Sequence, residues 1–439
     1  MKNEINSDDQ KRRNLYRKIS RRILVLLTIG YIVGYLDRVN VGFAKLQMLG
    51  ELKFTDTVYG MGAGIFFVGY FLFEVPSNLL LRRVGARMWI ARIMISWGII
   101  CAAMMFVATP TQFYVLRFLL GVAEAGFFPG VIYFLTTWYP SNRRAAVIAG
   151  LMTGVPVCSI LGSALSGWIM QALDGSCGLR GWQWLFVLEG TPAVLIGIWV
   201  LFRLTDDLDS ATWLTASEKQ LVRAELQKDV GQSSVTSLTA AMRQSRLWCA
   251  ALIYFALASG VYAISFWLPT LISEMGFKSV SQVGLLSAIP YIAAGATMVA
   301  IGLIADRGGS VRWRIALTAL IGAAGLILST KLTSSPYLCI AALSAAASGT
   351  LSAIPLFWRI PTAYLRETAA AGGIALINSF GNLAGFAGPY MIGWTKDLTG
   401  RTDAGLYVIA STMAVGALLV LIPMDAHSAS MARSLDPQS

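Results

Sequence analysis

An apolar run at residues 23–44 reads ILVLLTIGYIVGYLDRVNVGFA and is long enough to cross a bilayer as one helix. It nevertheless contains Asp37, Arg38 and Asn40. A charged side chain at mid-membrane costs at least about 2.5 kcal/mol, so such residues usually face a water-filled path and have a function there. Arg38 shares a helical stripe with Tyr35, whereas Asp37 is turned about 100° away and shares its side with Asn40. We therefore expect Arg38 to face a central cavity and Asp37 a neighbouring helix or gate; the alternative is a charge pair at the helix end.

A second apolar run at residues 113–135 reads FYVLRFLLGVAEAGFFPGVIYFL and contains Arg117 and Glu124. These residues are seven positions apart, which is two helical turns, so their side chains point the same way about 10 Å apart along the axis. Gly121 lies between them and is expected to leave room for something to pass. Two arginines in the two runs predict an anionic ligand, and two carboxylates predict proton binding. The alternative is ion pairing that only holds the helices together.

The composition excludes a soluble protein. Hydrophobic residues make up 56% of the chain, charged residues make up 13%, and the mean hydropathy is +0.63. Soluble domains average roughly 45–50% apolar and about 25% charged residues. Apolar runs near the length of a membrane helix occur twelve times, at about 23–44, 58–81, 88–108, 112–136, 145–171, 183–202, 247–272, 281–304, 313–331, 337–360, 370–394 and 405–424. We therefore predict an all-α membrane protein with twelve transmembrane helices.

The distribution of Lys and Arg predicts the orientation in the membrane. Residues 1–22 carry eight Lys and Arg residues, and the loops on the same side of the predicted spans carry most of the others. Because cytoplasmic loops are enriched in these residues, we predict a multi-pass protein of the inner membrane with both termini in the cytoplasm and no cleaved signal peptide. The net charge of +12 is then explained by topology and by contact with membrane lipid, not by nucleic-acid binding.

The order of the runs predicts two pseudo-symmetric six-helix bundles joined by a polar segment. Short basic turns with glycine follow both the second and the eighth run, which supports an internal repeat. Thr215 and Glu218 fit a capping box at the start of a helix within the polar segment. The predicted parts are a basic cytoplasmic tail at 1–22, an N-terminal bundle at 23–203, a cytoplasmic loop at 204–245, a C-terminal bundle at 246–425 and a cytoplasmic tail at 426–439.

Six phrases between residues 35 and 389 carry a resemblance to a known family: YLDRVNVGFA, FEVPSNLLLRRVGAR, RFLLGVAEAGFFPG, SFWLPTLI, FWRIPTAYL and GIALINSFGNLAGFAGP. With them the chain resembles the major facilitator superfamily, and within it the anion:cation symporter family of bacterial galactonate, tartrate, phthalate and hydroxyphenylacetate permeases. One departure is that Asn78 and Arg82 stand where the superfamily's first cytoplasmic turn usually has glycine and aspartate. The resemblance implies a transporter that imports a small organic carboxylate with protons by alternating access, and we expect it to be a monomer.

The resemblance also implies roles for individual residues. Asp37 and Glu124 match the family's proton-coupling carboxylates, and Arg38 and Arg117 match the arginines that bind the substrate carboxylate. We expect no cofactor, with the proton as the coupling ion. An uncoupled facilitator or an anion exchanger is the alternative, and a membrane sensor is less favoured.

Further polar and aromatic residues in the runs are candidates for the substrate site. Trp358 and Asn378 match family positions that line the C-terminal half of the cavity. Tyr70 has a phenol that could donate to a carboxylate, or it is an ordinary aromatic residue between helices. Asn382 lies one turn beyond Asn378, and either contacts substrate or belongs to a tightly packed GxxxG helix face. Arg359 would add a third cation and favour a dicarboxylate, or its side chain extends to the cytoplasmic interface.

The sequence lacks the motifs of several other kinds of protein. It contains no GxxxxGK[ST] motif, so no P-loop is predicted to bind ATP. Its single histidine, His427, lies outside every run, and its five cysteines form no CxxC pair, so we predict no metal site. No catalytic constellation is recognisable, and we therefore expect a transporter and not an enzyme.

Overall fold

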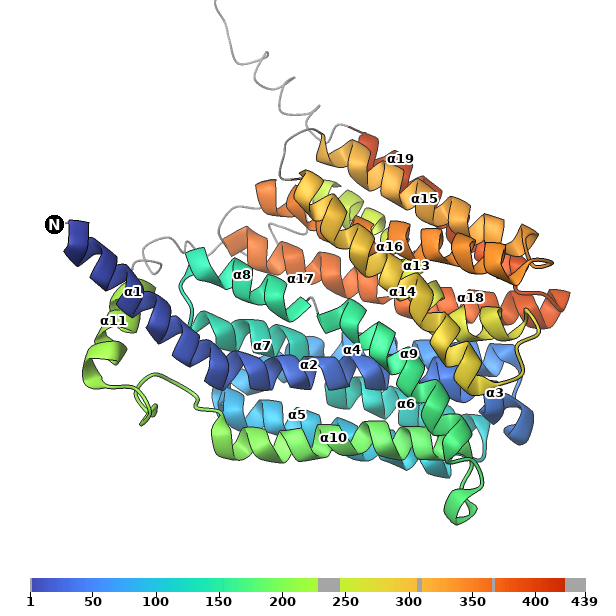
Figure 1. Ribbon diagram of the computed structural model, residues 1–439, viewed down its shortest axis with the longest axis horizontal. Coiled ribbons are helices and arrows are strands. Elements are labelled where there is room, and N and C mark those ends of the chain that lie inside the picture. The colour runs from blue at the N-terminus through green and yellow to red at the C-terminus, as the bar shows by residue number, and fades with distance from the viewer. Residues whose placement is uncertain (1, 153, 228–244, 306–309, 365–367, 423–439) are drawn as a thin grey trace, which may run out of the picture. The chain divides into compact units, whose positions relative to one another are not determined.

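The computed structural model describes residues 2–152, 154–227, 245–305, 310–364 and 368–422, and within these ranges it contains helices and no strand (Figure 1). The tail predicted at 426–439 and part of the loop predicted at 204–245 lie outside the described residues. In chain order the helices are α1 Lys2–Ile19, the π-helical turn η1 Ser20–Leu24, α2 Val25–Val39, α3 Val41–Leu52, α4 Asp56–Val84, α5 Ala86–Ala103, η2 Met104–Phe106, α6 Pro110–Glu124, α7 Phe127–Thr136, α8 Ser141–Met152, α9 Gly154–Ala172, η3 Ser176–Gly178, α10 Gly181–Arg203, α11 Ala216–Gln227, α13 Ser245–Ser273, α14 Val280–Ala305, α15 Val311–Lys331, α16 Pro336–Tyr364, α17 Thr368–Asn382, α18 Ala384–Thr399 and α19 Asp403–Leu421.

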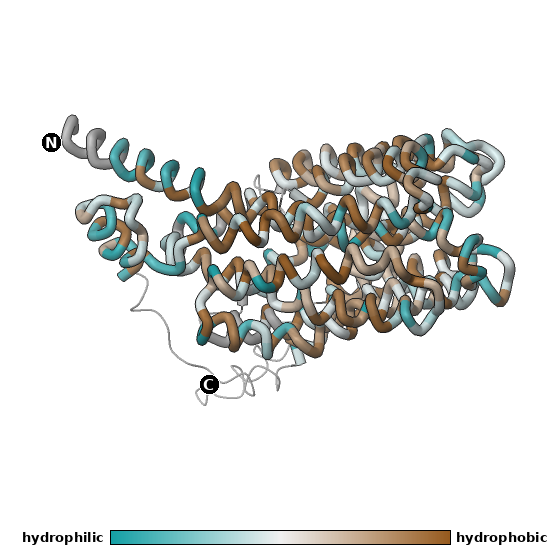
Figure 2. The backbone as a smooth tube through the Cα atoms, turned by 90° about the horizontal axis from the view of Figure 1, so that it is seen from below, coloured by the Kyte–Doolittle hydropathy of each residue, from teal (hydrophilic) through white to brown (hydrophobic). Residues whose placement is uncertain are grey.

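Most of the predicted apolar runs are helices long enough to cross a membrane. Eleven helical segments of the described chain meet the length and hydropathy of a membrane span. The remaining predicted run, at 370–394, is also helical, but it is divided at Leu383 into α17 and α18, of 15 and 16 residues. Figure 2 shows hydrophobic residues along the long helices and hydrophilic residues gathered at their ends and loops.

The chain forms two compact units, which we describe separately. Unit 1 comprises residues 1–233 and 269–288, and unit 2 comprises residues 234–268 and 289–439. The end of α13 and the start of α14 therefore pack with unit 1, although the sequence division placed them in the C-terminal bundle. The reason is close backbone contact between α9 and α14, since a Cβ on Gly284 would lie 2.5 Å from the carbonyl oxygen of Ser163. The division into two six-helix bundles stays a prediction.

In unit 1, α4 and α6 lie with their backbones in contact. A Cβ on Gly121 would lie 2.0 Å from the carbonyl oxygen of Phe66, and one on Gly69 would lie 2.5 Å from that of Phe118. Any larger residue at these positions would push the helices apart. The expectation that Gly121 leaves room for a passing ligand was wrong, because the α4 backbone occupies that space.

Two helices of unit 1 end beside the predicted charged residues. The α2 helix ends at Val39, one residue after Arg38, and the chain continues as α3. The α6 helix ends at Glu124, and Gly126 adopts a positive φ of 84° before α7 begins. Breaks of this kind within membrane-spanning segments are typical of transporter binding sites.

Candidate functional site

Asp37 lies buried on α2 and faces α5. Its side chain is 1% exposed. Trp97 donates its indole Nε1–H to Oδ2 at 2.9 Å, and Cys101 donates its thiol to Oδ1 at 3.5 Å. Among the described residues no lysine or arginine forms an ion pair with this carboxyl group. In the described chain, Asp37 is therefore held by uncharged donors. Both donors belong to α5, so Asp37 faces a neighbouring helix, as its position on α2 predicted.

Asn40 extends the same buried group toward α10. It is 1% exposed, and its Nδ2 lies 3.7 Å from the sulfur of Cys101. Glu189 on α10, also nearly fully buried, accepts a hydrogen bond from Ser166 at 2.7 Å. This corner of unit 1 thus contains a second buried carboxyl group without a recorded cationic partner in the described chain.

Arg38 points to another neighbour, Glu124 at the end of α6. The guanidinium Nη2 of Arg38 and Oε1 of Glu124 form an ion pair. The Arg38 side chain is 19% exposed and that of Glu124 is 5% exposed, so the arginine is the more accessible member. Tyr70 lies beside the pair, because the guanidinium carbon of Arg38 is 5.3 Å from the centre of its ring. Tyr35, on the Arg38 stripe, is half-buried.

Arg117 is fully buried and is bound to the backbone of α4. Its Nε donates to the carbonyl oxygen of Gly62 at 3.1 Å, and its Nη2 donates to that of Ala63 at 3.2 Å. The ring of Phe66 lies near both arginines, 5.1 Å from the guanidinium carbon of Arg117 and 5.4 Å from that of Arg38. Nη1 of Arg117 has no hydrogen-bond partner in the described residues. The arginine thus fastens α6 to α4, and Glu124 pairs with Arg38 instead of with Arg117.

The candidates in unit 2 lie among aromatic and amide groups. The ring of Trp358 packs at 4.9 Å from that of Tyr254 and at 5.5 Å from that of Phe357, measured between ring centres. Asn382 accepts a hydrogen bond from the hydroxyl of Tyr262 at 3.0 Å. Asn378 is half-buried, and Arg359 is exposed on α16.

The GxxxG face that includes Gly381 does pack tightly. A Cβ on Gly381 would lie 2.1 Å from the ring of Tyr254, so this glycine makes room for the aromatic cluster around Trp358. The packing alternative for this helix is therefore supported at Gly381.

The structure thus groups part of the predicted site and leaves the rest apart. Six predicted residues of unit 1 lie in two buried groups, which together we call the buried network: Asp37 and Asn40 meet at Cys101, while Arg38, Tyr70 and Arg117 lie around Phe66, with Glu124 paired to Arg38. The candidates in unit 2 belong to the other compact unit. That they line one cavity together with the residues of unit 1 stays a prediction. Within the described residues no group of three or more His, Cys, Asp or Glu side chains is arranged to hold a metal.

The sequence did not reveal Trp97 and Cys101, which hold Asp37, or Phe66, whose ring lies near both arginines. Trp97 and Cys101 are four positions apart and therefore share one face of α5, which is a signal visible in the sequence. The spacing does not predict which helix that face contacts, because the contact depends on how the helices pack. Phe66 offered no signal, since it is one of many aromatic residues in its helix.

Long apolar helices, some of them broken beside buried charges, define a multi-pass membrane transporter. The model of the Major Facilitator Superfamily matches residues 27–389, and the chain belongs to this superfamily. The predicted fold class and family are thereby confirmed, and the protein transports a small molecule and is not an enzyme.

Relatives and solved structures agree with this assignment. A Pseudomonas putida protein named "Putative metabolite transport protein NicT" is 45% identical, over 95% of this chain and 96% of its own. An Agrobacterium vitis protein named "Putative tartrate transporter" is 47% identical, also over 95% and 96% of the two chains. The xylose transporter XylE from E. coli, in a partially occluded inward open conformation, aligns with a TM-score of 0.72 over 92% of this chain and 97% of its own. At 13% identity, this last likeness shows the fold alone.

Proposed function

We propose that this protein is a monomeric inner-membrane symporter that imports a small organic carboxylate together with protons, with both termini in the cytoplasm. The single observation that carries the proposal is the ion pair between Arg38 and Glu124 inside an apolar bundle. A buried pair of this kind contributes little to stability, because desolvation of both charges offsets their attraction. Its presence is better explained by a function that needs both groups.

The pair offers a direct way to couple anion and proton. Arg38 is the more exposed member, so a carboxylate that enters beside it competes with Glu124 for the same guanidinium. Once displaced, Glu124 is a buried carboxylate without its counter-charge, a costly state that protonation relieves. Each ligand then favours the binding of the other, which is reciprocal coupling between two sites.

Asp37 has a different part in the proposal. It is fully buried, and in the described residues it accepts hydrogen bonds from the neutral donors Trp97 and Cys101 and pairs with no arginine that a substrate could displace. We assign it to a second protonation step, one that stabilises the contact of α2 with α5.

Arg117 contributes positive charge beside the pair while it holds α4 to α6. Direct contact with a substrate would require it to give up its bonds to the carbonyl groups of Gly62 and Ala63. Tyr70, Trp358 and Asn378 are proposed to shape the site, and no cofactor is part of the proposal.

The substrate class is proposed from charge and from the relatives. Arginines recognise carboxylates well because a planar guanidinium binds two oxygens at once. The name of the Agrobacterium vitis relative points to a hydroxy-dicarboxylate such as tartrate. Sugar acids and aromatic acids fit the same chemistry and are the alternatives within this class.

Transport by purified protein in liposomes tests the proposal. With an inward proton gradient, we expect accumulation of labelled tartrate or another acid of the panel, and none without the gradient. Glu124→Gln is expected to abolish gradient-driven accumulation while keeping exchange of labelled for unlabelled substrate. Glu51→Gln is the matched control, because Glu51 lies outside the buried network and its side chain is 36% exposed.

Three outcomes would contradict the proposal. Accumulation that ignores the gradient would indicate a facilitator or an exchanger. Loss of exchange as well as accumulation in Glu124→Gln would mean that Glu124 is not a dedicated proton carrier. Transport of neutral sugars but of no acid would remove the anion assignment.

A further inference from the structure

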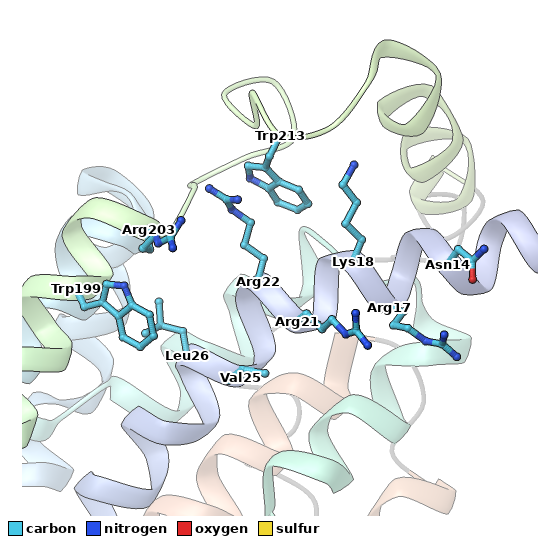
Figure 3. Close-up of a pocket in the computed structure, with 10 residues that line it drawn as sticks. All are labelled: Asn14, Arg17, Lys18, Arg21, Arg22, Val25, Leu26, Trp199, Arg203 and Trp213. Carbon is cyan, nitrogen blue, oxygen red and sulfur yellow. The ribbon is translucent and has the colours of Figure 1, made fainter.

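A cationic pocket lies in unit 1, away from the buried network. Its volume is about 600 Å³, and it is formed by the end of α1 with η1, the end of α10, and the segment before α11 (Figure 3). Five cationic side chains line it: Arg17, Lys18, Arg21, Arg22 and Arg203. No acidic residue is among the residues that line it.

The cations of this pocket are poorly neutralised by the protein itself. Among the residues that the structure describes, Lys18 is the one pocket cation with an ion pair, to Glu218 at 2.9 Å. Nε of Arg22 is buried without a hydrogen-bond partner in the described chain, and the Arg22 guanidinium carbon lies 5.2 Å from the ring centre of Trp213. The pairs Arg17–Arg21 and Lys18–Arg22 are each four positions apart, a spacing at which like charges on a helix repel.

The backbone at the pocket is unusual as well. Arg21 and Arg22 both belong to η1, which is a π-helical turn inserted between α1 and α2. Single π-helical turns inside longer helices are rare and occur frequently at functional sites. A bound anion would offset the charge repulsion.

The other wall of the pocket is apolar and exposed. Of the lining residues, Val25 is 49% exposed and Trp199 is 45% exposed; Phe202, which is next to Arg203 in the chain but does not line the pocket, is 81% exposed. These side chains lie where α2 and α10 enter their membrane-spanning segments. Tryptophan at such a position is typical of the membrane interface. A free phosphate ion would use the cations and leave the apolar wall unused.

We propose that this pocket binds the headgroup of an anionic glycerophospholipid, with its phosphate among the arginines and its acyl chains along Val25, Trp199 and Phe202. Basic pockets between membrane helices attract anionic headgroups by this combination of charge and apolar surface. The bound lipid also contacts Trp213, which is stacked on Trp138 at 5.6 Å between ring centres. Lipid binding thereby holds the start of the central loop against the N-terminal bundle.

Native mass spectrometry of the full-length protein, titrated with phosphatidylglycerol or phosphatidylcholine, tests the proposal. Each Lys or Arg near a lipid surface contributes about 1 kcal/mol, which is about fivefold in affinity. Phosphatidylglycerol is therefore expected to bind more tightly than phosphatidylcholine. The double variant Arg21→Gln/Arg22→Gln should weaken that binding about 25-fold, and Arg203→Gln alone should weaken it about fivefold.

The matched control removes two arginines elsewhere, in Arg180→Gln/Arg401→Gln, and should leave affinity within about twofold of the unchanged protein. Equal binding of both lipids, or equal losses in the control and the test variants, would overturn the proposal. A third arm adds inorganic phosphate, and full displacement of the lipid by millimolar phosphate would show a phosphate site instead. If Arg21→Gln/Arg22→Gln does not fold, Arg203→Gln decides, and an unchanged affinity in that variant refutes the lipid site.

Discussion

Unit 1 contains four charged candidates, Asp37, Arg38, Arg117 and Glu124, all buried or partly buried, whereas the buried or half-buried candidates of unit 2, Trp358, Asn378 and Asn382, are aromatic or amide side chains and its one charged candidate, Arg359, is exposed. Arg38, Glu124 and Arg117 make an ion pair and two bonds to helix carbonyl groups. Trp358 instead packs on Tyr254 and Phe357. From this difference we infer that unit 1 recognises the charge of the substrate and couples its transport to protons, whereas unit 2 selects the substrate by shape.

The strongest test of this division is Arg38→Gln, which should reduce uptake about 100-fold or more. Removing one partner of a buried ion pair lowers the free energy of unfolding by about 3–5 kcal/mol, because the other charge is left buried and unpaired. The same change removes the proposed substrate contact. Initial uptake rates in liposomes, corrected for the amount of folded protein, give the measurement.

A second variant separates folding from recognition. Arg38→Gln/Glu124→Gln removes both members of the ion pair, so neither is left as an unpaired charge, and we expect its thermal stability to return toward that of the unchanged protein while uptake stays lost. If the double variant recovered uptake, Arg38 would serve only to neutralise Glu124, and charge recognition would have to lie elsewhere.

Gly121→Ala tests whether the charged network depends on the contact between α4 and α6. An added Cβ would lie 2.0 Å from the Phe66 carbonyl oxygen, which belongs to a backbone that cannot move aside cheaply. We expect a loss of about 1–3 kcal/mol, typical of overpacking, seen as a lower melting temperature in detergent. Gly150→Ala is the control, because nothing lies within 4 Å of its added Cβ. Equal melting temperatures for both variants would show that the helices are not in the close contact described.

The directions of the charged side chains could be predicted from the sequence, but their partners could not. The 100° offset between adjacent residues predicted that Asp37 faces a neighbouring helix, which the structure shows to be α5, whereas the central cavity expected beside Arg38 stays a prediction. The capping box of Thr215 and Glu218 is present. Both features depend on local helical geometry. Arg117 illustrates the limit, because its bonds to α4 depend on how closely two helices approach.

The breaks in the helices escaped prediction for a similar reason. The run at 113–135 is apolar throughout its second half, so hydropathy gave no reason to end a helix at Glu124. Gly126 permits the break through its positive φ, and the side chain of Ser77 fills the space that a Cβ would need there. That neighbour comes from α4, some fifty positions earlier, and no local pattern records it.

Trp358→Ala tests the other half of the comparison. The change removes ring contacts in unit 2 but no charge, so we expect KM for the substrate to rise about three- to tenfold, as for a loss of roughly 1 kcal/mol of aromatic contact. Gradient-driven accumulation should persist at high substrate concentration. Trp313→Ala, at a tryptophan that is 66% exposed, is the control and should not change KM. Loss of proton coupling in Trp358→Ala would mean that coupling is not confined to unit 1.

The smallest expected effect concerns the contact of α11 with α1, at the edge of the charged unit. Partial burial tends to raise the pKa of Glu218, but hydrogen bonds from Lys18 and from the backbone of Thr215 outweigh it and keep this pKa below its usual value. A carboxyl group with a lowered pKa stabilises the folded contact fully above the unfolded value of about 4.3 and loses that contribution as the pH falls through the lowered value. Since the Lys18–Glu218 pair is partly exposed, with 43% and 27% side-chain exposure, its contribution to stability is less than about 1 kcal/mol.

Protease cleavage within residues 204–245 should therefore increase slightly between pH 5 and pH 3, and Glu218→Gln should remove this pH dependence. An unchanged pH dependence in Glu218→Gln would contradict the assignment of this release to Glu218.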